Sequence, residues 1–215
     1  MKKNPTLILD CDGVILDSNL LKVEVVRKVL LEMPQMFPNN KVEAAVESFK
    51  CNFGKSRYWH VENMQNYLNK PCMNFKDKFL SDYVNALKKS YSRASLCEGI
   101  EVFLKNNKLQ KYIVSGSDQD ELRKVLKSKN LDKYFVKIFG SPTSKSDNIS
   151  SIKKIVNGEL IFFGDSFEDL KASEQNQIEF IFYKPYSLVK SNLEEVSRQK
   201  GYRVLESWRS FSFDG

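Results

Sequence analysis

The chain has 215 residues and a mass of 24.9 kDa, enough for one domain or for one domain that carries a smaller insertion. With 41% hydrophobic and 28% charged residues and only 9 Gly and 6 Pro, collagen-like, low-complexity and wholly disordered classes are excluded. No apolar run approaches the roughly 18–20 residues that span a bilayer, so we expect no membrane partner.

The formal charge of +7 favours an anionic partner, either nucleic acid or a small anionic substrate. Residues 16–95 carry 13 Lys and Arg against 8 Asp and Glu, and the other residues carry 21 against 19. The excess forms no block of five or six consecutive basic residues. We therefore expect a small anionic substrate and no nucleic acid.

The amino terminus and the cysteines predict a cytoplasmic protein. Lys2 and Lys3 precede an apolar stretch, as in a secretory signal, but Asp10 and Asp12 interrupt it and no small-residue cleavage site follows. The four cysteines form no C-x-x-C pair, which favours reduced core thiols over a zinc site or a disulfide framework. They are Cys11, Cys51, Cys72 and Cys97.

In chain order, five short apolar runs are typical of strands buried on both faces. They cover residues 6–9, 112–114, 136–139, 160–163 and 179–183. Helix-like segments separate the last four. In the first of these segments Leu122, Val125 and Leu126 share one face, and Ser117 with Asp120 resembles a capping box. The pattern predicts an α/β core with a doubly wound parallel sheet.

About a hundred residues separate the first two runs, too many for one crossover helix. Their apolar spacing is helical, because aromatic or leucine side chains recur at every fourth position from Phe75 to Tyr91, and Val42, Ala45, Val46 and Phe49 form a second stripe. We predict an inserted all-helical cap domain at residues 17–95. Residues 1–16 and 96–215 then form the core domain.

Polar residues follow four of the five runs, and these residues predict the site. Asp10 and Asp12 follow the first run, Ser115 the second, Lys145 the third and Asp165 the fourth. Because the carboxyl ends of parallel strands share one edge of the sheet, we expect these side chains to converge there. Carboxylates hold Mg²⁺, and a hydroxyl and an ammonium cover phosphate oxygens, so the group suits phosphoryl chemistry.

The same residues resemble the four motifs of the haloacid dehalogenase superfamily. The segment Asp10-Cys11-Asp12-Gly13-Val14 is similar to the first motif, D-x-D-G-[TV], and Gly164-Asp165-Ser166-Phe167-Glu168-Asp169 to the fourth, G-D-x-x-x-D. Ser115 and Lys145 stand where the second and third motifs place them. The insertion resembles the helical cap of the phosphoglycolate phosphatase and β-phosphoglucomutase subgroup.

The resemblance implies a role for each residue. Asp10 would be the nucleophile that forms an aspartyl-phosphate, and Asp12 the general acid and then the general base. Mg²⁺ would be held by Asp10, the Asp12 backbone carbonyl, Asp165 and Asp169, with Glu168 as an alternative to Asp169. Ser115 and Gly116 would bind phosphate, and Lys145 would pair with both the phosphate and Asp10. Dehalogenases and phosphonatases of the superfamily lack the second aspartate, so Asp12 argues against both.

The segment Phe53-Gly54-Lys55-Ser56-Arg57 is similar to the substrate-specificity loop of such caps, which implies that Lys55 and Arg57 bind the substrate. The alternative is a helix start capped by Ser56 with exposed basic side chains, and both interpretations stay open. His60, the only histidine, is expected to have a packing or surface role rather than a catalytic one.

Together these patterns predict a cytoplasmic, Mg²⁺-dependent phosphohydrolase that acts on a small phosphorylated metabolite through an aspartyl-phosphate. A phosphomutase needs the same four motifs, and a catalytically idle binding protein of the same fold is the third alternative. The pattern leaves open the substrate, the oligomeric state and the role of the tail at residues 185–215.

Overall fold

The structure is a computed structural model that describes residues 4–68 and 72–212. Its centre is a parallel sheet of six strands in the order β5-β4-β1-β6-β7-β8. The strands are β1 (Thr6–Leu9), β4 (Lys111–Asp118), β5 (Lys137–Ser141), β6 (Leu160–Gly164), β7 (Glu179–Tyr183) and β8 (Arg203–Leu205). All five predicted strands are confirmed, and β8 is an addition.

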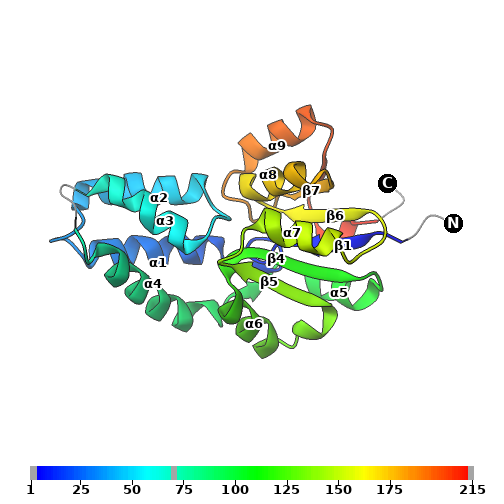
Figure 1. Cartoon of the computed structure of the whole chain (residues 1–215), viewed down its shortest axis with the longest axis horizontal. Helices are drawn as coiled ribbons and strands as arrows, with labels where there is room; N and C mark the ends of the chain where they lie inside the picture. The colour runs from blue at the N-terminus through cyan, green and yellow to red at the C-terminus, as the bar shows by residue number, and fades with distance from the viewer. Residues whose placement is uncertain (1–3, 69–71, 213–215) are drawn as a thin grey trace.

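Helices cover both faces of the sheet, because successive strand residues point to opposite sides. Leu7 and Leu9 face the core that contains α5 (Ile100–Asn106) and α6 (Gln119–Ser128). Ile8, between them, packs with the other face. That face is covered by α7 (Lys145–Lys153), α8 (Phe167–Asn176) and α9 (Lys190–Gln199), as Figure 1 shows. The predicted doubly wound fold is therefore confirmed.

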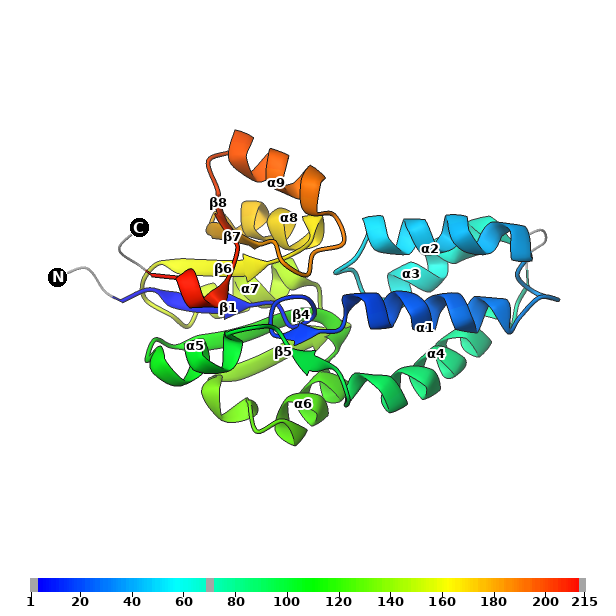
Figure 2. The ribbon, with the colours of Figure 1, turned by 180° about the vertical axis from the view of Figure 1, so that it is seen from behind.

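The insertion is a helical cap that lies beyond the carboxyl ends of the strands (Figures 1 and 2). Its helices are α1 (Asn19–Leu31), α2 (Val42–Cys51), α3 (Arg57–Met64) and α4 (Phe75–Tyr91). The aromatic stripe of α4 is buried as predicted, with Phe79 and Tyr83 stacked at 5.8 Å between ring centroids. Where the chain leaves and re-enters the core, β2 (Leu16–Asp17) pairs antiparallel with β3 (Ser95–Leu96).

Short 3-10 helices complete the described elements, namely η1 (Asn39–Lys41), η2 (Gln65–Tyr67), η3 (Asp132–Tyr134) and η4 (Trp208–Ser210). Within the described residues no helix is long and apolar enough to cross a membrane.

Two local predictions are wrong. Ser117 does not cap α6, because β4 extends to Asp118 past an irregular register, and Asp118 accepts the hydrogen bonds from the first amides of the helix. The cysteines are all free, but only Cys11 and Cys97 are core residues, since Cys51 is exposed and Cys72 half-buried. A thiol at the end of α2 faces solvent because the apolar stripe of that helix ends at Phe49.

The tail packs on the core, as its mixed apolar pattern predicts, although that pattern left its role open. Trp208 in η4 is 3% exposed and packs on Phe103, Phe163 and Tyr183. Its indole N–H donates to the Val14 carbonyl at 2.9 Å, in the turn that follows the first motif. The tail therefore supports the loop that carries Asp10 and Asp12.

We predict that Trp208→Ala lowers the free energy of unfolding by about 3–5 kcal/mol, because it removes a buried aromatic ring and leaves the Val14 carbonyl without its donor. Urea unfolding measures the change. Trp59→Ala is the matched control, since its ring is 37% exposed and should cost less than half as much. Equal losses in the two variants would contradict the role given to Trp208.

Candidate active site

Three carboxylates meet at the edge of the sheet where the strands end. Asp10 follows β1, Asp165 follows β6, and Asp169 lies in the first turn of α8. One carboxylate oxygen of each lies within 4.8 Å of the others, and none of the three residues is more than 1% exposed. The convergence predicted from the parallel sheet is present for these acids, which we call the acid cluster.

Lys145 is the ammonium that faces this cluster. It is the first residue of α7, which Ser144 caps, and its side chain is 2% exposed. Its Nζ lies 2.5 Å from Asp169 Oδ1 and 3.1 Å from Asp10 Oδ1. Burial alone would lower the pKa of Lys145, but Asp10 and Asp169 outweigh it and raise that pKa above its usual value. Lys145 is therefore a permanent cation beside Asp10.

The other oxygen of Asp169 closes a capping box at the start of α8, where Ser166 is the cap. It accepts from the Ser166 hydroxyl at 2.5 Å and from the Ser166 amide at 3.1 Å. Glu168, the alternative ligand in the sequence, is outside the acid cluster.

The acid cluster fits a divalent cation. Asp165 Oδ1 is buried and has no hydrogen-bond donor among the described residues, and Asp10 Oδ1, also buried, has only the Lys145 ammonium at 3.1 Å, in a geometry that makes no hydrogen bond. Burial raises the pKa of Asp10, the charge of Lys145 lowers it, and repulsion from Asp169 and Asp12 raises it. The result is a pKa of about 7 for Asp10. Burial and the charges of Asp10 and Asp169 raise the pKa of Asp165 well above its usual range. Hard oxygen ligands with unmet demand are what Mg²⁺ prefers.

Gly13 is required next to this cluster. Its φ of +76° is unfavourable for other residues, and a Cβ there would lie 2.1 Å from Asp165 Oδ2. Asp165 Oδ2 instead accepts from Asn19 Nδ2 at 2.6 Å, which ties α1 of the cap to the cluster.

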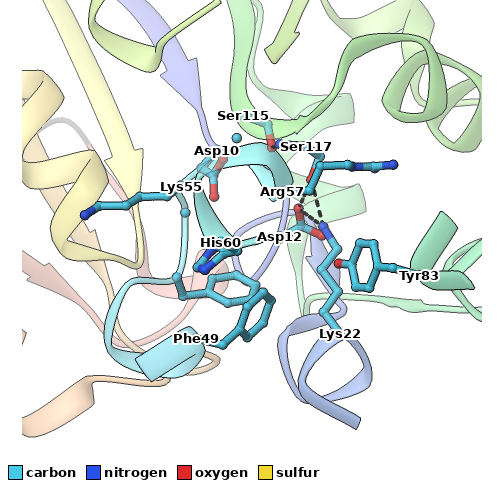
Figure 3. Close-up of a pocket in the computed structure, with 13 residues that line it drawn as sticks. Asp10, Asp12, Lys22, Phe49, Lys55, Arg57, His60, Tyr83, Ser115 and Ser117 are labelled. Carbon is cyan, nitrogen blue, oxygen red and sulfur yellow. Dashed lines mark hydrogen bonds and ion pairs between the residues drawn. The ribbon is translucent and has the colours of Figure 1, made fainter. Parts of the chain in front are cut away.

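Asp12 lies in a separate network built around Lys22 of α1, shown by dashed lines in Figure 3. Lys22 Nζ donates to Asp12 Oδ2 at 2.5 Å and to Ser117 Oγ at 2.7 Å. The hydroxyls of Ser18 and Ser117 donate to Asp12 at 2.5 and 2.6 Å. Burial alone would raise the pKa of Asp12, but Lys22 and these hydrogen bonds hold it below its usual value, so Asp12 is a carboxylate.

Lys22 and Asn19 are site residues that the sequence analysis missed. Both are buried, and they lie on the same stripe of α1 as Val23 and Val26. The sequence did contain a signal, because these polar residues occupy positions of a helix where the periodic pattern expects apolar ones. A lysine on a buried helix face needs a charged partner.

Ser115 and Gly116 lie in the second half of β4, which continues past the predicted run, and they line a cavity with Asp10 and Asp12. Ser115 is 1% exposed, and its Oγ accepts from the Ser117 amide at 3.2 Å. A Cβ on Gly116 would lie 2.1 Å from the Gly54 carbonyl oxygen, so the cap loop rests directly on the core. This inner cavity, about 40 Å³, has room for a few water molecules, and the cap is closed.

Lys55 lies in the cap loop before α3 and Arg57 is the first residue of α3, and their side chains point in opposite directions (Figure 3). Arg57 lines the inner cavity and binds Glu121 of α6 through both guanidinium nitrogens, at 3.0 and 2.5 Å. Lys55 donates to Asn52 Oδ1 at 3.0 Å and lies 3.7 Å from the centroid of the Trp59 ring. Ser56 caps α3, as the alternative interpretation expected, but the Arg57 side chain is only 9% exposed.

His60 is buried and lines the inner cavity, where its ring packs on that of Phe49. It is 4% exposed, and its ring centroid lies 4.3 Å from that of Phe49. Burial, with Lys55 and Lys22 nearby, lowers the pKa of His60 to about 3, so it is neutral near pH 7.

A sequence profile of the haloacid dehalogenase-like hydrolase family matches residues 7–183, which is most of the chain and includes all four motifs. The chain belongs to this family. This match confirms the resemblance to the haloacid dehalogenase superfamily that the four motifs indicated. No curated protein sequence matches this haloacid dehalogenase-like hydrolase.

Solved structures share its whole architecture at low sequence identity. A predicted phosphoglycolate phosphatase from Haemophilus somnus has a TM-score of 0.75 at 11% identity, with 97% of this chain and 96% of that one covered. A HAD hydrolase of family IA, variant 3, from Entamoeba histolytica has a TM-score of 0.74 at 14% identity over 98% and 96%. The β-phosphoglucomutase of Clostridium difficile has a TM-score of 0.72 at 19% identity over 99% and 95%. These likenesses show the fold, including the cap.

We predict that Mg²⁺ stabilises the protein against heat, and more at pH 8 than at pH 5. Without the cation, the raised pKa of Asp10 means that the folded protein holds a proton that the unfolded chain releases near pH 4. Stability from this group is therefore lost as the pH rises from about 4 to 7. Mg²⁺ competes with that proton, and at about 100 times its Kd should raise the unfolding midpoint by roughly 5–10 °C at pH 8.

Differential scanning calorimetry after chelation and after Mg²⁺ addition measures both shifts. Asp165→Asn serves as the control, because it removes one repelling charge and one ligand and should abolish most of the Mg²⁺ response. An Mg²⁺-induced rise in the unfolding midpoint that is the same at pH 5 and pH 8, or the same in Asp165→Asn as in the wild type, would contradict a cation at the acid cluster.

Proposed function

We propose that the protein is a Mg²⁺-dependent phosphohydrolase that acts on a small phosphorylated metabolite through an aspartyl-phosphate on Asp10. The observation that carries the proposal is the placement of Asp10 between two opposite environments. On one side lie the acid cluster and Lys145, and on the other the ionised Asp12 in its hydrogen-bond network. A nucleophile, a cation site and a proton-transfer group thus share one closed site.

In the first half-reaction an Asp10 carboxylate oxygen attacks phosphorus, and the bond from phosphorus to the leaving oxygen breaks. Asp12, protonated when its contact with Lys22 is open, would supply the proton that the leaving oxygen takes up. Ser115 and Gly116 line the cavity on the β4 side and would bind the phosphate oxygens, with Lys145 pairing with phosphate and Asp10. Mg²⁺, held by Asp10, the Asp12 carbonyl, Asp165 and Asp169, would neutralise charge on the transferring group.

In the second half-reaction water attacks the phosphorus of the aspartyl-phosphate, and Asp12 takes the proton of that water. The ionised state of Asp12 in the closed structure is the one that this step needs. The inner cavity beneath the cap leaves room for this water.

The residues 17–95 serve in this proposal as the cap domain that selects the substrate, with the rest of the chain as the core. Lys55 and Arg57 are its cationic contacts. Arg57 already pairs with Glu121, so a substrate anion on the inner side shares that guanidinium with a core carboxylate. The fold of the β-phosphoglucomutase neighbour keeps a phosphomutase as the alternative, and the cytoplasm is the proposed compartment.

We predict Mg²⁺-dependent hydrolysis of p-nitrophenyl phosphate, with free phosphate released at every turnover. Asp10→Asn should lower kcat by roughly a thousandfold or more, because an amide oxygen is a poor nucleophile. Colorimetric assays of nitrophenol and of phosphate give both numbers. Isomerisation of hexose phosphates without phosphate release would reverse the ranking of phosphatase over mutase, and full activity of Asp10→Asn would refute the nucleophile.

We predict that Lys22→Met moves the acidic limb of the pH profile for hydrolysis of the aspartyl-phosphate, the step in which Asp12 is the base, to higher pH, as measured by the decay of the phosphorylated protein after rapid mixing. Lys22 is the main group that holds the pKa of Asp12 low, so without it Asp12 becomes protonated at a higher pH and the base form is lost earlier. Lys28→Met, on the exposed face of the same helix, should leave the profile unchanged. An unshifted limb in Lys22→Met would show that Lys22 does not set the protonation of Asp12.

A further inference from the structure

A second cavity, of about 250 Å³, lies between cap and core next to the inner one, and we call it the outer cavity. Its cap wall is formed by Lys55, Ser56 and Trp59, and its core wall by residues 141–145 with Glu168 and Lys171. The two cavities adjoin, because Gly54, Lys55 and Gly116 line both. Asp10 of the inner cavity also pairs with Lys145 of the outer one. The outer cavity thus begins where the proposed phosphoryl group would lie.

The outer cavity has cations that no carboxylate neutralises. Within residues 4–68 and 72–212, neither Lys55 nor Lys171 forms an ion pair. Among the described residues, the Lys55 ammonium interacts with Asn52 Oδ1 and the Trp59 ring, and the side chain points away from Asp12 (Figure 3). Glu168 is the one carboxylate in the wall, against three lysines, one of which is committed to the acid cluster. An anion would be attracted into this cavity.

Neutral donors line the same wall. The amino terminus of α7, a helix of nine residues, lies there, and the partial positive charge of its first turn faces anions. Ser141, 2% exposed, lines the cavity, and its hydroxyl has no hydrogen-bond partner among the described residues. A buried hydroxyl without a partner is costly, and a ligand in the cavity that accepted its hydrogen bond would remove that cost.

We propose that the outer cavity is a second oxyanion site, which binds a phosphate group beside the catalytic one through Lys55, Lys171 and Ser141. The phosphate has two possible sources, a remote phosphate of the substrate itself or free inorganic phosphate. Binding of a remote substrate phosphate rests on the proposed function, whereas binding of free inorganic phosphate does not.

Binding is tested by titrating the intact protein with inorganic phosphate while following tryptophan fluorescence. Trp59 lines the cavity and is in contact with Lys55, whereas Trp208 is buried in the core, so an anion near Lys55 changes the emission of Trp59. Trp59→Phe should abolish the change. Lys171→Ala should weaken binding about tenfold, the size of one charge-assisted contact, and Glu168→Gln should strengthen it.

Lys154→Ala is the matched control, since this exposed lysine lies outside the cavity wall and should leave the affinity unchanged. Equal affinities in the wild type, Lys171→Ala and Glu168→Gln would overturn the second site. Because the titration needs no turnover, it stands whether or not the protein hydrolyses any ester.

The source is decided by hydrolysis of straight-chain diol monophosphates and their matched bisphosphates. A remote substrate phosphate gives a kcat/KM that is about tenfold higher for the bisphosphate, and Lys171→Ala removes this preference without changing the monophosphate rate. If the site binds free phosphate instead, kcat/KM is the same for the monophosphate and the bisphosphate, whereas the fluorescence titration with inorganic phosphate still depends on Lys171. If neither measurement depends on Lys171, the proposal is wrong. If no ester is hydrolysed, the proposed function fails and the titration alone decides the cavity.

Discussion

The buried ammonium of Lys145 is the charge on which the arrangement of the site depends. Asp10 and Asp169 both face it, and all three side chains are at most 2% exposed, so each charge is balanced by a neighbour rather than by water. The loop after β5 places Lys145 at the start of α7, and the capping box of α8 orients Asp169. Both features hold these charges next to one another. The remaining negative charge, shared by Asp10 and Asp165, is what a divalent cation would neutralise.

Closure of the cap is coupled to the same electrostatics. Asn19 and Lys22 of α1 and Arg57 of α3 each bridge from the cap to a core carboxylate or a first-motif carboxylate. Removing Lys22 from Asp12 would raise the pKa of Asp12, so cap movement and proton transfer by Asp12 are linked through one contact. In the proposed mechanism, the step in which Asp12 gives a proton is favoured when the contact between Lys22 and Asp12 is open. The step in which Asp12 takes a proton is favoured when that contact is made, as in this structure.

The sheet and the acid cluster could be predicted because both follow from local pattern. Strands buried on two faces give continuous apolar runs, and a parallel sheet aligns the residues that follow them. Lys22 was missed because its partner, Asp12, is reached only when the cap folds onto the core. The pairing of Arg57 with Glu121 joins residues 64 positions apart, and β8 has only three residues with no repeating pattern, so neither left a local signal.

The central claim is that Asp10 becomes phosphorylated. Acid quenching during turnover of p-nitrophenyl phosphate, followed by borohydride reduction and peptide mass spectrometry, tests it directly, because reduction converts an acyl phosphate at an aspartate into homoserine. The account predicts homoserine at position 10 in the wild type with Mg²⁺, and none after chelation. Phosphate release with Asp10 unmodified at every quench time, or homoserine at another aspartate, would contradict it.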